Sequence, residues 1–216
     1  MNESLVSKIL ATPDAYLVLD KVNAALEEEK VRRHKFYFDF DDHDKIEFIN
    51  GEVIIQPHVD LQTGRASGRL LALLGYYTIK HMPKTFVGFR RTIVALTRND
   101  YEPDICFFGE EKSCEFTDEQ TLFPAPDLAI EVISEATEHR DRGVKFRDYQ
   151  AHGVEEYWIV DPRKRTLEQY HLINGTYELI LKAQTCDVKS FVIDGFQIPI
   201  RAIFDDAENL KAIQNL

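Results

Sequence analysis

Cysteine, long apolar runs and positive charge are all scarce in this sequence. Its three cysteines, Cys106, Cys114 and Cys186, form no CxxC pair and cannot all pair with one another, which argues against a disulfide framework and against a thiolate zinc site. No window approaches the roughly 20 apolar residues that a membrane helix needs. The first residues, MNESLVSKIL, lack the basic start and apolar core of a secretory leader. We therefore expect a cytoplasmic protein with no membrane partner.

Acidic residues outnumber basic ones, with 37 Asp and Glu against 26 Lys and Arg, and the formal net charge is −11. This balance excludes a surface that binds nucleic acid everywhere. The net negative charge does not exclude a local groove lined by basic residues. A bound polyanion would need a metal ion and focused positive charge to overcome the background repulsion.

The 216 residues suit one well-buried domain, and we see no linker that would divide it. Residues 1–40 are expected to form a helical extension, 41–200 an α/β core with a mixed sheet, and 201–216 a terminal helix. Apolar spacing predicts a helix over 61–80, and Asn50-Gly51 predicts a tight hairpin turn. Strands are expected at residues 45–55 (as that hairpin), 86–96, 105–108, 127–133, 156–161, 166–173 and 177–183, and a loop at 109–124.

Two segments, EPDICF (102–107) and PDLAIE (126–131), each place a carboxylate at or in an apolar strand. A buried carboxylate is costly unless it meets a cation or a donor. If the strands of Asp104 and Glu131 are neighbours, the two carboxylates converge and repel, and one would be driven to protonate. A hard divalent cation, Mg²⁺ or Mn²⁺, would resolve this and could activate water for phosphodiester hydrolysis. The alternatives are a turn-capping Asp104 and a structural ion pair at Glu131.

A helix is expected after the strand of Glu131, with Asp141, Lys145 and Tyr149 spaced four residues apart. The flexible stem of Lys145 can fold back toward Glu131, where its ammonium group would position water or neutralise an oxyanion. The alternative is a simple pair between Lys145 and Asp141 along the helix.

Basic residues cluster around these segments. Arg90 and Arg91 precede the first carboxylate segment, and Arg140 and Arg142 follow the second. On a negatively charged chain these four arginines are our candidates for phosphate contacts, although ordinary solvated faces explain them equally well.

Several motifs occur together in a fixed order: NGE (50–52), PD (103–104), PDLAIEVIS (126–134), the spaced Asp141 and Lys145, and GVEEYWIVDP (153–162). In this order they resemble the Uma2 (DUF820) family, which is described as restriction endonucleases of the PD-(D/E)XK nuclease superfamily. The resemblance runs from about residue 46 to 181. It implies a restriction-endonuclease-like core, with a mixed central β-sheet flanked by helices.

The resemblance also implies roles for single residues. Asp104 matches the superfamily's strand Asp, and Glu131 matches its acidic position. The residue two beyond Glu131 should be Lys and is Ile133; in the Uma2 type a lysine on the following helix, here Lys145, substitutes for it. The main-chain carbonyl of Val132 is the implied further metal ligand.

An upstream acid often completes such sites. Glu52 is our candidate for it, and it is equally plausible as an exposed hairpin residue.

The prediction is therefore a divalent-metal-dependent endonuclease that hydrolyses phosphodiester bonds in DNA, with Mg²⁺ or Mn²⁺ as cofactor. Asp104, Glu131, Lys145 and Glu52 are its expected catalytic residues, and Asp104, Glu131 and Val132 its metal ligands. A paired cut needs two sites, which favours a homodimer or higher homo-oligomer. The alternative from another class is a catalytically silent nucleic-acid-binding or oligomeric interaction protein that retains the nuclease fold. A hydrolase of small phosphate esters is the third hypothesis.

Overall fold

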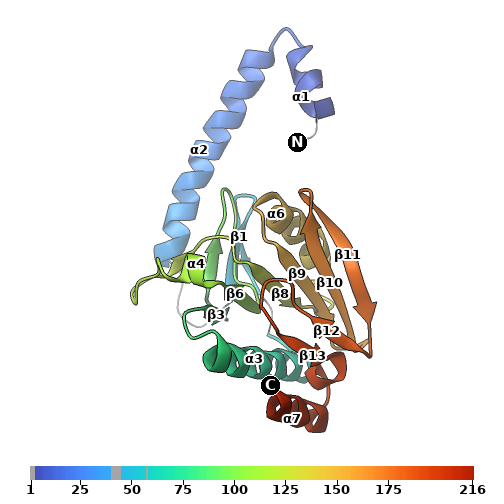
Figure 1. Cartoon of the computed structure of the whole chain (residues 1–216). Helices are drawn as coiled ribbons and strands as arrows, with labels where there is room; N and C mark the ends of the chain where they lie inside the picture. Colours follow the sequence, from blue (N-terminus) through green and yellow to red (C-terminus); the bar gives the residue numbers. More distant parts are fainter. Residues whose placement is uncertain (1–2, 40–44, 57) are drawn as a thin grey trace.

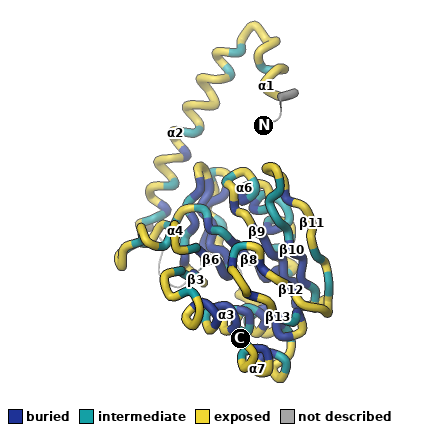
Figure 2. The backbone as a smooth tube through the Cα atoms, in the orientation of Figure 1, coloured by how far each residue is buried: buried dark blue, intermediate teal, exposed yellow. Residues whose placement is uncertain are grey.

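The computed structural model describes residues 3–39, 45–56 and 58–216, and its N-terminal part is an extended helical arm (Figure 1). The arm consists of α1 (Glu3–Leu10) and α2 (Ala15–Asp39). Most of its length is exposed and projects away from the body of the protein (Figure 2). No helix in the described part of the chain is long and apolar enough to span a membrane.

Bidentate ion pairs fasten the base of this arm to the body. Arg33 donates from Nε and Nη2 to both carboxylate oxygens of Asp100, each at 2.6 Å. Arg98 donates to both oxygens of Glu29 at 2.8 Å. Forked pairs of this kind are among the stronger hydrogen bonds in proteins, so they fix the direction in which α2 leaves the body.

Within the described residues, the strands form three sheets. The largest has the order β11-β10-β9-β8-β6-β3. Its strands are β3 (Phe86–Phe89), β6 (Ile105–Phe108), β8 (Leu128–Val132), β9 (Glu156–Asp161), β10 (Thr166–Ile173) and β11 (Thr176–Ala183). β8 and β9 run parallel while the other neighbours are antiparallel. The expected mixed sheet flanked by helices is therefore confirmed.

Parallel neighbours need a crossover connection, and here it carries the helical residues of the candidate site. The crossover between β8 and β9 contains α5 (Glu138–Arg140), the π-helical turn η1 (Asp141–Lys145) and α6 (Phe146–Ala151). The sequence predicted one regular helix in this place. The structure differs from that prediction by the π-helical turn, and such turns are frequent at functional sites.

The second sheet has the order β2-β1-β5-β4-β7. Its strands are β1 (Ile46–Ile49), β2 (Glu52–Ile55), β4 (Ile93–Ala95), β5 (Asp100–Tyr101) and β7 (Leu122–Phe123). The predicted hairpin is confirmed, because Asn50 and Gly51 have φ of 52° and 86°, as a primed turn requires. The loop expected at 109–124 contains β7 and the short helix α4 (Glu110–Ser113).

The continuous strand expected over 86–96 is wrong. Arg90 and Arg91 both take left-handed conformations, with φ of 30° and 60°, and divide it into β3 and β4, which belong to different sheets. Left-handed backbone costs a non-glycine residue on the order of 1–3 kcal/mol. Residue type alone gave no signal for this corner.

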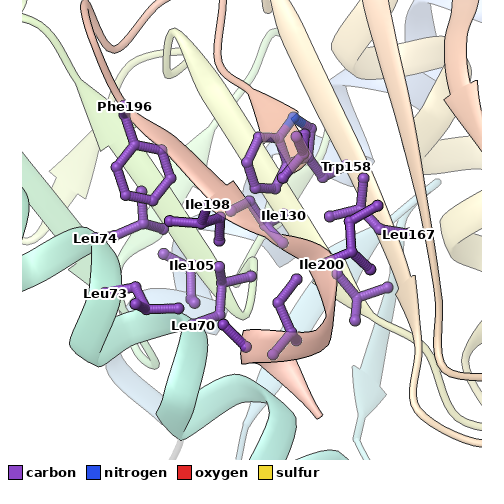
Figure 3. Packing of buried hydrophobic residues seen from close by; sticks show 14 of the residues in the cluster. Leu70, Leu73, Leu74, Ile105, Ile130, Trp158, Leu167, Phe196, Ile198 and Ile200 are labelled. Atoms are coloured by element: carbon purple, nitrogen blue, oxygen red, sulfur yellow. The ribbon is translucent and has the colours of Figure 1, made fainter. Parts of the chain in front are cut away.

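The largest core cluster lies between the main sheet and α3 (Leu61–His81). Asp60 caps α3 by accepting a 2.8 Å hydrogen bond from the Thr63 N–H. Every predicted apolar position of this helix is buried: Ala66, Leu70, Leu73, Leu74 and Tyr77. Figure 3 shows the leucines against Ile105, Ile130 and Trp158. Around them lie the third sheet, β12 (Asp187–Lys189) with β13 (Gln197–Pro199), the 3₁₀ turn η2 (Ile200–Ile203) and α7 (Asp206–Asn215).

The alternation of β8 divides its side chains between two cores. Ile130 belongs to the core beneath α3, whereas Ala129 and Ile133 belong to a second cluster that also contains Tyr149 and Tyr157. Glu131 shares the face of Ala129 and Ile133 because side chains alternate along a strand. Its carboxylate therefore faces the crossover, where the π-turn lies.

Candidate active site

Lys145 is the centre of a buried cluster of charges. Its ammonium nitrogen Nζ lies 2.7 Å from Glu47 Oε1, 3.1 Å from Glu131 Oε1 and 3.2 Å from Asp141 Oδ1. Only 1% of the Lys145 side chain is exposed. One strand of each large sheet and the π-turn thus contribute to the same cluster, and the predicted approach of Lys145 to Glu131 is present in the geometry.

Asp104 lies at the entrance of the cluster, just before β6. Its Oδ1 is 2.8 Å from the ammonium group of Lys45, and its Oδ2 accepts a 2.8 Å hydrogen bond from the backbone N–H of Val132. Burial alone would raise the pKa of Asp104, but the positive charge of Lys45 holds that pKa below its usual value. Asp104 is therefore ionised, and it is tied to the residue that follows Glu131.

The pKa values of Glu131 and Asp141 shift upward, in contrast to that of Asp104. Burial raises the pKa of Glu131 to about 8, although Lys145 opposes the shift. Burial and the neighbouring carboxylate of Glu47 also raise the pKa of Asp141. Burial by itself would lower the pKa of Lys145, yet the surrounding carboxylates raise it well above its ordinary value. The lysine is charged, and the acids around it compete for that single charge.

The sequence alone did not single out two charged residues of this cluster, Glu47 and Lys45. Glu47 lies between the apolar Ile46 and Phe48 of β1 and is fully buried. Its second oxygen accepts a 2.5 Å hydrogen bond from the side chain of Gln56. A carboxylate inside an apolar strand was the signal that singled out Glu131, and the same signal, applied to residues 46–49, would have found Glu47.

The structure does not bring Glu52 into the cluster. Glu52 is exposed at the start of β2, opposite Ile49 and next to the turn. The hairpin register sets Glu47 three residues before the turn, opposite Ile54, where it can reach Lys145. Of the two acids in this hairpin, the one that lies at the candidate site is Glu47.

Two connected hollows give access to these groups. A small cavity of about 20 Å³ is lined by Asp104, Glu131, Val132, Asp141 and Lys145, among others. That is room for about one water molecule or one ion. A groove of about 430 Å³ shares Lys45, Gln56, Val59 and Asp104 with the cavity and continues to Arg90 and Arg91.

The four arginines expected at phosphates have separate surroundings. Arg90 and Arg91 line the groove, while Arg140 donates to Gln56 at 3.1 Å. Arg142 is held by the carboxylate of Glu168, at 2.7 and 2.9 Å, and also by Glu138. Of the four, Arg90 and Arg91 are therefore the two that line the groove.

A divalent cation suits this site in charge and in donor type. Four carboxylates, those of Glu47, Asp104, Glu131 and Asp141, face the two ammonium groups of Lys45 and Lys145, so the fully ionised cluster carries two uncompensated negative charges. The buried Oδ1 of Asp141 lies at ion-pair distance from Lys145 but makes no hydrogen bond within the described residues. Hard cations prefer such carboxylate oxygens.

The metal ligands are not preassembled, however. Among the described residues, no three His, Cys, Asp or Glu side chains are arranged to hold a metal ion. The carboxylates are directed at the lysines, so an ion would have to compete with the ammonium groups for the same oxygens.

Comparison with known proteins settles the family. Residues 29–201 match the model of the Uma2 family, whose description is "Putative restriction endonuclease". The chain belongs to the Uma2 family. This confirms the resemblance drawn from the motifs, and the match takes in the whole of the charged cluster.

A solved structure shows the same fold. It is that of a putative nuclease belonging to DUF820 from Anabaena variabilis ATCC 29413, which is similar to this Uma2 chain with a TM-score of 0.63 at 17% identity. The similarity covers 74% of this chain and 89% of that one. No curated protein matches the sequence.

Proposed function

We propose that this Uma2 protein is a divalent-metal-dependent endonuclease that hydrolyses phosphodiester bonds in DNA. The observation that carries the proposal is the recessed carboxylate–lysine cluster, which opens through Asp104 into a groove lined by arginines. Membership of a family described as endonucleases supports it.

Asp104, Glu131 and the main-chain carbonyl of Val132 are the residues that would hold Mg²⁺ or Mn²⁺. When bound, the ion supplies Lewis acidity and a water molecule of lowered pKa. The excess carboxylate charge of the cluster favours its binding.

The two lysines have different positions and, in this proposal, different roles. Lys145 contacts three carboxylates and is almost wholly buried, so it holds Glu131 and Glu47 in place rather than meeting a phosphate in the groove. Lys45 has 24% of its side chain exposed and lines both hollows. Its ammonium group is therefore the one that would face the phosphate and stabilise the charge that develops there.

Cleavage of labelled DNA, single-stranded and duplex, with Mg²⁺, Mn²⁺ or EDTA tests the proposal. We expect metal-dependent cleavage that Asp104→Ala and Glu131→Gln abolish, and that the matched surface variant Glu178→Gln retains. Circular dichroism would confirm that each variant is folded. Cleavage at the wild-type rate by both site variants would refute the assignment.

A second candidate is a nucleic-acid-binding protein without turnover. The lysine-bound carboxylates and the lack of three preassembled acidic ligands among the described residues favour it. Calorimetric titration with Mg²⁺ and Mn²⁺ separates the two functions. DNA binding with no metal uptake would favour the silent protein.

The predicted homodimer follows from a paired cut in both strands of a duplex, and it stays a prediction. Light scattering of the purified protein would test it. A monomeric mass would leave single-strand cleavage as the reaction available to one site.

A further inference from the structure

The charged cluster lies well below the surface of the protein. Glu131 and Lys145 are about 1% exposed, and the Asp104 side chain 16%. A phosphodiester bond must therefore enter the groove to reach Asp104. Duplex DNA is stiff, with a persistence length of about 150 base pairs, whereas an unpaired strand can bend into a recess.

One wall of the groove combines an exposed aromatic ring with two cations. Phe89, the last residue of β3, is 51% exposed and lines the groove beside Arg90 and Arg91. A solitary exposed Phe is ordinary. An aromatic face next to basic side chains in one groove is instead the arrangement with which proteins bind unpaired strands, through base stacking and phosphate contacts.

Small residues of α3 also line the groove. Gly64, Ser67 and Gly68 line the groove, and a side chain added at Gly68 would meet open space. Among the described residues, no atom beyond the local helix backbone and the two adjacent residues lies within 4 Å of a side-chain carbon built at Gly68, so a ligand can approach the helix closely at this position.

Several basic side chains outside the groove lie against carboxylates, as in the pairs of Arg142 with Glu168, Arg98 with Glu29, Lys84 with Glu110 and Lys112 with Asp127. A protein that makes about 6–10 phosphate contacts with a duplex gains much of its affinity from them. The groove contributes three cations, Lys45, Arg90 and Arg91, beside the carboxylates of Glu102 and Asp104, and the net charge of −11 opposes a larger set of phosphate contacts.

We propose that the groove binds single-stranded DNA, or the unpaired end of a duplex, with one base stacked on Phe89 and adjacent phosphates at Arg90 and Arg91. The inference rests on the proposed function and names its substrate class. It places the strand so that the next phosphodiester reaches Asp104 and Lys45. A single strand needs one cut, so one copy of the chain suffices.

Fluorescence anisotropy tests the inference with a labelled oligonucleotide, as a single strand and as a blunt duplex. EDTA in the buffer removes divalent metal ions and so prevents metal-dependent cleavage. We expect tighter binding of the single strand. Phe89→Ala should weaken that binding about 5- to 150-fold, the usual effect of removing one stacking aromatic. Phe89→Trp should retain it because indole also stacks. Phe38→Ala, which removes an exposed ring from α2, is the matched control and should change nothing.

Tighter binding of the duplex would overturn the inference, and so would a folded Phe89→Ala protein that binds the single strand as wild type does. Its failure is distinguishable from that of the endonuclease proposal. Phe89-dependent binding of single strands without cleavage in Mg²⁺ or Mn²⁺ would support this groove and refute the nuclease. Metal-dependent cutting of duplex at internal sites, without any preference for unpaired DNA, would support the endonuclease and refute the single-strand groove.

Discussion

Replacing Lys145 by methionine tests whether the three carboxylates that contact Lys145 depend on its charge. The substitution keeps an unbranched apolar stem and removes the ammonium group that contacts Glu47, Glu131 and Asp141. Removing one partner of a buried ion pair typically costs about 3–5 kcal/mol, because the remaining charge is left uncompensated. We expect the free energy of unfolding, measured by urea denaturation at pH 8, to fall by about that amount.

The pH dependence of the loss identifies its cause. Without the cation, the folded-state pKa values of Glu131 and Asp141 rise further above their unfolded values. A group with a raised folded pKa stabilises the protein below its unfolded pKa, and this contribution is lost as pH rises through the folded pKa. Since the pKa of Glu131 is raised from 4.5 to about 8 even with Lys145 present, the deficit should be smallest near pH 4.5 and largest at pH 8 and above.

Lys182→Met is the matched control. Lys182 also contacts a carboxylate, that of Glu168 at 3.0 Å, but 58% of its side chain is exposed. Exposed pairs contribute about 0–1 kcal/mol, so this variant should unfold almost as wild type does. A loss below about 1 kcal/mol for Lys145→Met at pH 8, or a deficit of equal size at all pH values, would refute the reasoning.

Two further predictions concern other acids. Glu47→Gln should reduce metal-dependent cleavage by at least about tenfold, since it removes a carboxylate that holds Lys145. Glu52→Gln should cleave as wild type does. If a nuclease assay gave the reverse order, Glu52 would be the upstream acid of the site. Burial would raise the pKa of Glu168, but its hydrogen bonds, chiefly with Arg142, lower that pKa to about 2. The stability that ionised Glu168 contributes is therefore fully present above its unfolded pKa near 4.5, and it is lost as the pH falls toward 2. Urea denaturation from pH 5 to pH 2 should therefore show a smaller acid-induced loss for Glu168→Gln than for wild type, and equal losses would contradict the shift.

Local chemistry explains which parts of the fold the sequence predicted well. The Asn50-Gly51 hairpin depends on two adjacent residues that tolerate positive φ, and the buried stripe of α3 depends on spacing within one helix. Both signals lie in neighbouring residues, so they are readable without knowledge of the rest of the chain.

The features that the sequence missed depend on distant partners. The corner at Arg90 and Arg91 uses residues with no preference for left-handed backbone, so it is imposed by the two sheets that it joins. No residue type in the segment 141–145 predicts the π-turn either. Glu47 and Lys45 join the cluster only when the fold brings β1 near the π-turn and Asp104.

The crossover geometry gives a physical reason for the apolar residue at position 133. Ile133 lies on the face of Glu131 and is fully buried in the second core, where a lysine would need a cation-binding partner of its own. The π-turn of the crossover instead directs Lys145 at Glu131, and the lysine reaches Asp141 and Glu47 as well. An ammonium group so enclosed cannot serve the groove. In the proposed function, Lys45 is the cation that would meet the phosphate nearest to Asp104. Lys45→Ala should therefore lower cleavage while leaving the contacts of Lys145 with its three carboxylates intact.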